Sequence, residues 1–180
     1  INTYAPALDC TVKLPQIEHN QHEISTPDVI YQIVKDTPIE LPALLAMWLS
    51  LTESEILGLT KSKSISSDGC YITIKEVIVK DEHNNAVVKN KGKQPTRDRT
   101  LRLPEYLKQL IDKVETDQLV TLSGTALSKR FNRLITKAGI PHMTFHDLRH
   151  VNASVMAVLR ITAKYAQERG GWKTDHIMKS

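Results

Sequence analysis

The chain has 180 residues, of which 41% are hydrophobic, so it is long enough for one well-buried core and short for two. No apolar run approaches the roughly 18 residues of a membrane span, and the first residues lack the pattern of a secretion signal. The two cysteines, Cys10 and Cys70, fit neither a zinc site nor a disulfide framework. We expect one soluble domain in a reducing cytoplasm, with no membrane partner.

Positive charge is concentrated in the middle and at the end of the sequence, although the net charge is only +4. Residues 1–88 hold 6 Lys and Arg against 12 Asp and Glu, residues 89–137 hold 12 against 5, and residues 138–180 hold 6 against 3. A segregated basic region suits a polyanion, because each phosphate contact releases condensed counterions. The alternative is a solvated basic face.

Helix signals dominate the first third of the chain. Residues 1–24 show little periodicity and indicate a linker or an N-terminal arm. Three helices are predicted, one from a hydroxyl residue followed by Pro27, one from an apolar run, and one from the capping-box pattern Thr52-x-x-Glu55. These helices are expected at 25–36, 41–49 and 52–59.

Short β-branched segments follow, and then helical patterns return. The segments predict strands at 71–74, 77–79, 86–88 and 100–103. Later helices are expected at 105–115, 123–138, 146–158 and 162–169. The expected fold class is mainly α with a small antiparallel β-sheet.

One segment carries the most specific chemical signal. Residues 144–150 read Thr-Phe-His-Asp-Leu-Arg-His, and Gly170-Gly171-Trp172 follows. His146 and Arg149 share one face of a helix, because they are three residues apart. This combination resembles the His-x-x-Arg box and the His/Trp position of the tyrosine recombinases, the phage-integrase family. The order of helices, small sheet and helices also resembles that family's catalytic domain, over residues 25–180.

The resemblance implies a role for each matching residue. Arg149 would hold the scissile phosphate with both arms of its planar guanidinium. His146 would bond the phosphate and accept the proton of the tyrosine nucleophile, and Trp172 would donate one hydrogen bond and pack beside them. His150 would support these groups from behind.

A basic run before the last strand resembles the family's hairpin lysine. Residues 93–99 read Lys-Gln-Pro-Thr-Arg-Asp-Arg, close to the pattern Lys-x-x-Ser/Thr-x-Arg. The resemblance implies that Lys93 delivers a proton to the departing 5′-oxygen. Lys91, Arg97 and Arg99 are expected to bind the DNA backbone. In the alternative interpretation, the whole run only rests along the DNA.

The sequence departs from the family at its first arginine. Where the family reads approximately Gly-x-Arg-x-Ser-Glu-Leu, this chain reads Ser-Leu-Thr-Glu-Ser-Glu-Ile from Ser50, so Thr52 stands in the arginine position. Losing one preorganised donor costs ~10²–10³ in rate. Reduced catalysis is therefore expected, unless another cation such as Lys61 or Lys63 compensates.

The nucleophile itself is not matched. The resemblance places a tyrosine about nine or ten residues after Trp172, whereas the sequence ends at Ser180. Tyr165 precedes Trp172, and we expect it to face the protein interior and not a phosphate. The 180 residues alone are expected to form no covalent DNA adduct.

The resemblance implies site-specific DNA recombination by an integrase of a phage or mobile element, acting in the cytoplasm of a bacterial host at the nucleoid. The partner would be double-stranded DNA, with a homotetramer of the intact enzyme on DNA and a monomer for this fragment. No cofactor or metal is implied. One alternative is a catalytically degenerate DNA-binding or regulatory domain. Another is a metal-dependent hydrolase that uses His146 and His150, whose i, i+4 spacing resembles a zinc motif.

Overall fold

The computed structural model describes residues 25–83, 85–90 and 99–172, and the mainly helical class with small antiparallel sheets is confirmed. The helices are α1 (Pro27–Val34), α2 (Glu40–Leu49), α3 (Glu53–Leu57), α4 (Lys61–Ser64), α5 (Glu105–Asp112), α6 (Gly124–Ala138), α7 (Asp147–Val158) and α8 (Ala163–Gly170). The strands are β1 (Tyr71–Ile74), β2 (Glu76–Lys80), β3 (Ala86–Asn90) and β4 (Arg99–Arg102). The sequence did not predict α4, which is a single turn.

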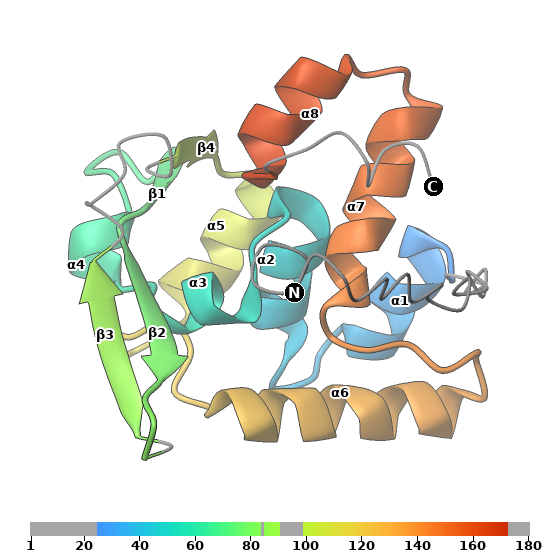
Figure 1. Cartoon of the computed structure of the whole chain (residues 1–180), viewed down its shortest axis with the longest axis horizontal. Coiled ribbons are helices and arrows are strands. Elements are labelled where there is room, and N and C mark those ends of the chain that lie inside the picture. Colours follow the sequence, from blue (N-terminus) through green and yellow to red (C-terminus); the bar gives the residue numbers. More distant parts are fainter. Residues whose placement is uncertain (1–24, 84, 91–98, 173–180) are drawn as a thin grey trace, which may run out of the picture.

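Helix α2 lies in the middle of the molecule, beside α7 and above α6 in the view of Figure 1. Its residues are apolar on nearly every side, and all of them are buried except Trp48, which is half-buried. A helix with this pattern is stable only when other elements cover it from several directions. Helices α1, α3, α5 and α7 do so, and α2 forms the buried centre of the fold.

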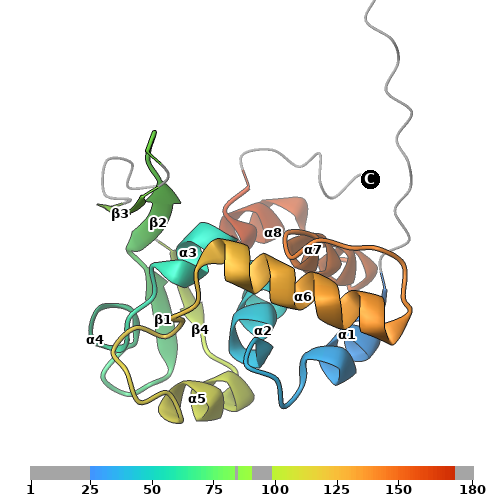
Figure 2. The same cartoon turned by 90° about the horizontal axis from the view of Figure 1, so that it is seen from below.

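The strands form two separate two-stranded sheets in place of the one small sheet expected. Strand β1 pairs antiparallel with β4, Ile72 lying opposite Leu101, and these two side chains are buried. Strand β2 pairs antiparallel with β3, Ile78 lying opposite Val88, whose side chain is 57% exposed. The first sheet therefore joins the core, while the second extends from the body of the protein (Figures 1 and 2).

The connection from α2 to α3 determines the geometry of the site. Helix α2 ends at Ser50, which has left-handed backbone angles (φ 58°, ψ 34°). The predicted capping box follows and is confirmed: the Thr52 hydroxyl accepts from the Glu55 N–H (3.3 Å), and the Glu55 carboxylate accepts from the Thr52 N–H (2.8 Å). By contrast, the Thr26 hydroxyl makes no capping bond to α1.

Candidate active site

The C-terminal end of α2 is a meeting point for side chains from three other elements. Carbonyl groups in the last turn of a helix lack intrahelical donors, and they lie at the negative end of the helix dipole. Asn152 donates to the carbonyls of Met47 (2.8 Å) and Trp48 (3.2 Å). Arg169 also donates to the Trp48 carbonyl (3.4 Å). The Ser50 carbonyl accepts from Arg149 (2.8 Å) and from Arg99 (3.3 Å). The dipole thus offsets part of the cost of bringing the guanidinium groups together.

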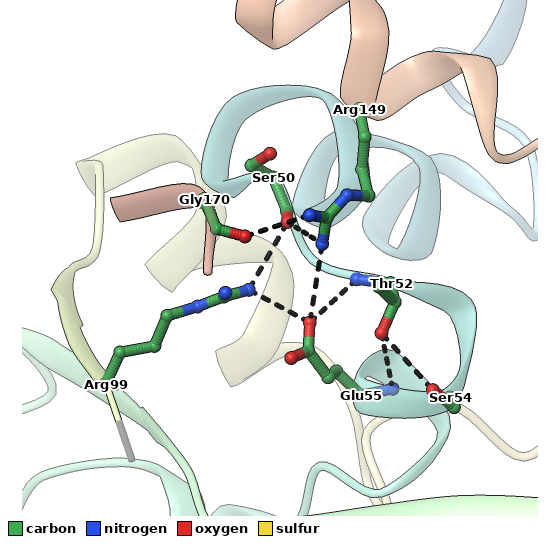
Figure 3. Close-up of polar contacts among 7 residues, drawn as sticks. All are labelled: Ser50, Thr52, Ser54, Glu55, Arg99, Arg149 and Gly170. Atoms are coloured by element: carbon green, nitrogen blue, oxygen red, sulfur yellow. Dashed lines mark hydrogen bonds and ion pairs between the residues drawn. The ribbon is translucent and has the colours of Figure 1, made fainter. Parts of the chain in front are cut away.

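Arg149 is buried at this meeting point, although it is charged (6% exposed). Its Nη1 donates to the Ser50 carbonyl at 2.8 Å, and its Nη2 donates to the Gly170 carbonyl at 2.9 Å, as Figure 3 shows. Burial lowers the pKa of Arg149 to about 10, while the charge of Glu55 opposes the shift. The side chain therefore stays cationic at neutral pH, held in one orientation by α2 and the end of α8.

Arg99, Arg149, Glu55 and Ser50 form a compact unit that we call the arginine cluster (Figure 3). Glu55 Oε2 lies 2.9 Å from Arg99 Nη2 and 3.9 Å from Arg149 Nη1. Burial is the main cause that lowers the pKa of Arg99, and Glu55 again opposes it. Two guanidinium groups against one carboxylate leave the cluster with a net positive charge, which suits an anionic ligand.

His146 stands at the start of α7, one turn before Arg149. The loop before it is fixed because Asp147 Oδ2 accepts from both the N–H (2.6 Å) and the hydroxyl (2.9 Å) of Thr144. Partial loss of hydration, followed by the charges of His150 and Arg149, lowers the pKa of His146. The two imidazole rings lie with centroids 5.4 Å apart, nearly perpendicular. A mainly neutral His146 at neutral pH can accept a proton.

Trp172 packs against the arginine cluster from the end of α8. Its ring centroid lies 5.5 Å from Arg149 Cζ, within the range of a cation–π contact. The two preceding glycines make this approach feasible. A Cβ on Gly170 would lie 2.7 Å from the Trp172 ring, and a Cβ on Gly171, whose φ is +65°, would overlap Arg99 Nη1.

The structure brings most of the sequence-predicted site residues to one place. Arg149, His146, His150 and Trp172 lie together, and Thr52 is joined to them through Glu55. Lys91, Lys93 and Arg97 lie outside the described residues, so their placement remains a prediction.

Two placements were not evident from the sequence. Arg99, whose binding to DNA stays a prediction, has a side chain that is only 10% exposed and contacts Glu55. Tyr165 was expected to face the protein interior, but it is 53% exposed on α8. That expectation was wrong because α8 is a mainly polar helix that buries only Ala166 and Gly170.

Three contributors to the site were missed by sequence reasoning. Glu55 was identified only as a capping residue, although it also binds Arg99 across 44 positions of sequence. Ser50 supplies its backbone carbonyl, which no side-chain pattern reveals. The available signal was positional: Ser50 stands where the family has glycine, and its left-handed φ explains that glycine. Gly171 makes room for Arg99.

Two negative findings apply only to the residues that the structure describes. No group of three or more His, Cys, Asp or Glu side chains there is arranged to hold a metal ion. None of the helices found there has both the length and the apolar character to cross a membrane.

Comparison with known sequences identifies an integrase as a relative. The integrase of Mycobacterium phage L5 is 24% identical over 186 aligned residues, which cover 93% of this chain. The chain spans 50% of the length of that integrase. No family model matches the chain.

Solved structures agree with this result. The Tn1549 transposon integrase in complex with transposon right end DNA superposes with a TM-score of 0.75 at 16% identity, over 91% of this chain and 62% of that one. XerA recombinase gives a TM-score of 0.64 at 16% identity, over 98% and 65%. A lambda integrase dimer bound to a COC′ core site gives 0.57 at 20% identity, over 86% and 46%. The described residues therefore have the fold of a tyrosine-recombinase catalytic domain, and the resemblance found in the sequence is confirmed.

Proposed function

We propose that this chain is the catalytic domain of a tyrosine recombinase that cuts and rejoins double-stranded DNA at specific sites, as an integrase of a phage or mobile element. The observation that carries the proposal is the buried Arg149, held by the carbonyls of Ser50 and Gly170 with His146 one turn before it. The similar Tn1549 and lambda integrases are described in complexes with DNA, which supports DNA as the partner.

The reaction assigns one task to each group. A tyrosine oxygen forms a bond to the scissile phosphorus, and the bond from phosphorus to the 5′-oxygen breaks. The tyrosine proton passes to His146, Lys93 gives a proton to the 5′-oxygen, and Arg149 and Trp172 donate hydrogen bonds to nonbridging oxygens. The products are a 3′-phosphotyrosyl link and a free 5′-hydroxyl. A hydroxyl of the partner duplex reverses the step, so no nucleotide cofactor or metal is required.

A second candidate function is a DNA-binding or regulatory domain that has lost the chemistry. The observation in its favour is Thr52, which fills the family's first-arginine position with a helix cap. This candidate predicts DNA binding without a covalent product, whereas the recombinase predicts both.

The test is covalent attachment of the full-length natural protein to a nicked suicide duplex. The core site is first selected from random duplexes by binding, and the adduct is detected on a denaturing gel. We expect an adduct, and we expect Arg149→Ala to abolish it while the variant still melts cooperatively. Binding without an adduct would favour the second candidate, and the absence of any binding would contradict both.

Assembly is part of the same proposal. The 180 residues alone should be monomeric, while the intact enzyme should form a homotetramer on two core sites in the cytoplasm of its bacterial host. Light scattering of the free chain at micromolar concentration tests the first statement. A stable dimer there would contradict it.

A further inference from the structure

The cation expected at position 52 is not supplied by the neighbouring lysines. Lys61 donates to the backbone carbonyl of Val114. Lys63 pairs with Glu76 at 2.8 Å on the surface, with 58% of its side chain exposed. Both lysines are thus engaged with partners outside the arginine cluster.

Arg99 reaches the same region from a different element. It projects from β4 into the arginine cluster and binds the two groups that Arg149 also approaches. Arg99 Nη2 lies 2.9 Å from Glu55 Oε2 and 3.3 Å from the Ser50 carbonyl, and Arg149 Nη1 lies 3.9 Å and 2.8 Å from the same two oxygens. The two guanidinium groups are therefore neighbours around shared acceptors, as Figure 3 shows.

The same carboxylate joins Arg99 to position 52. Glu55 Oε2 accepts both from the Thr52 backbone N–H (2.8 Å) and from Arg99 (2.9 Å). The Arg99 guanidinium and the backbone N–H of Thr52, the residue that replaces arginine, therefore share one acceptor atom. Gly171 lacks the side chain that would exclude Arg99 Nη1.

Arg99 has hydrogen-bonding capacity that the described residues do not use. Both hydrogen bonds that Arg99 makes to the described residues come from Nη2. Its Nε is buried and has no partner among the residues that the structure describes. A buried donor without a partner is costly, and a phosphate oxygen is a strong acceptor for guanidinium.

We propose that Arg99 is the second phosphate-binding arginine of this enzyme, supplied by β4 in place of the residue at position 52. This inference rests on the proposed function. Arg99 and Arg149 then donate to the nonbridging oxygens as their charge develops in the transition state. Glu55 holds both side chains in place, and Thr52 is free to cap α3.

Cleavage of the selected suicide duplex by the full-length natural protein tests the assignment. Arg99→Ala should lower the cleavage rate by ~10²–10³, as expected for one preorganised donor. Arg99→Lys keeps the pairing with Glu55 but loses the planar fork, so its loss should be smaller. In Arg99→Ala, adding Thr52→Arg should restore part of the rate, whereas Thr52→Arg alone should add little.

A second substrate separates contact with phosphate from a structural role. A methylphosphonate at the scissile position removes the charge of one nonbridging oxygen, so Arg99→Ala should lose much less on it than on phosphate. If Arg99 only positioned Glu55, the two substrates would lose equally, and that result would overturn the assignment. If Arg99→Ala does not fold, the loss of cleavage rate in Arg99→Lys is compared between the two substrates instead. A smaller loss on methylphosphonate supports contact with phosphate, and an equal loss overturns the assignment.

Two controls complete the design. Arg102→Ala removes an exposed cation from the same strand, and any loss should be equal on both substrates. Arg149→Ala reports on the proposed function: unchanged cleavage there, or none by the unsubstituted protein, would overturn that function together with this inference. Cleavage that needs Arg149 but survives Arg99→Ala at full rate would overturn this inference alone.

Discussion

Ser50 combines two unfavourable features at one residue. Its φ of 58° lies in the left-handed region, where a side chain costs roughly 1–2 kcal/mol. Its hydroxyl is also buried and has no hydrogen-bond partner in the described part of the chain. Ser50→Gly should remove both costs while keeping the carbonyl that binds the two arginines. Glycine also raises the conformational entropy of the unfolded chain, which offsets part of this gain. We therefore expect the unfolding free energy to rise by about 1 kcal/mol, measured by denaturant titration.

Arg160 provides a matched control for this prediction. It also has a positive φ (54°), but its side chain is exposed after α7. Arg160→Gly should therefore remove only the cost of the positive φ, and it should raise the unfolding free energy less than Ser50→Gly does. Destabilisation by Ser50→Gly would show that its hydroxyl makes a contact important for the fold.

His146 should make stability depend on pH. Its pKa is lowered in the folded protein, so near the unfolded value of about 6.5 the unfolded chain binds more protons. The unfolding free energy should therefore fall as the pH drops from about 7 through 6.5 towards the folded pKa. His146→Gln should flatten this slope in titrations between pH 5 and 8. His142→Gln, on the exposed loop before α7, is the control, and an equal effect of both variants would contradict the assignment.

At the scale of elements, the start of α3 depends on one hydroxyl. Thr52→Ala removes the acceptor for the Glu55 N–H and should cost about 1 kcal/mol of unfolding free energy. Thr52→Ser keeps the acceptor and should retain most of the stability in thermal or denaturant unfolding. If Thr52→Ala left the unfolding free energy unchanged, the Glu55 carboxylate alone would suffice for the cap.

Local signals predicted the helices well, because a cap or a period lies within a few residues. The Thr52 capping box and the left-handed Gly139 that ends α6 are examples. Helix α4 was missed although Thr60 caps it, because a four-residue turn has no detectable period. The division of the strands into two sheets also escaped prediction. Pairing β1 with β4 depends on contacts far apart in sequence, and the short β-branched strands do not encode them.

The site residues that belong to a local motif could be predicted from the sequence. Those that only the tertiary fold brings together could not. Arg149, His146 and Trp172 were found because the motif spacing survives in the sequence. Arg99 was predicted only as a DNA-binding residue, since nothing near it in the chain reveals its contact with the buried Glu55. Only the tertiary structure brings β4 to the end of α2.

For the whole molecule, the uneven charge predicts how it binds DNA. The 180 residues should bind duplexes of any sequence with modest affinity, about 10⁻⁴ to 10⁻⁶ M, and binding should weaken steeply with salt. Four exposed basic residues on α6 contribute to this field: Lys129, Arg130, Arg133 and Lys137. Titration of a labelled duplex at two salt concentrations measures the slope. Binding that ignores salt, or no binding at low salt, would contradict a phosphate-dominated interface.

The arrangement around Ser50 also makes the arginine cluster depend on the complete fold. The two arginines come from β4 and α7, the carboxylate from α3, and the carbonyls from the ends of α2 and α8. Detaching any one of these elements removes a holder of the guanidinium groups. Under the proposed function, the groups that would act on a scissile phosphate come together only when the tertiary fold is complete, so a partly folded chain would lack the site.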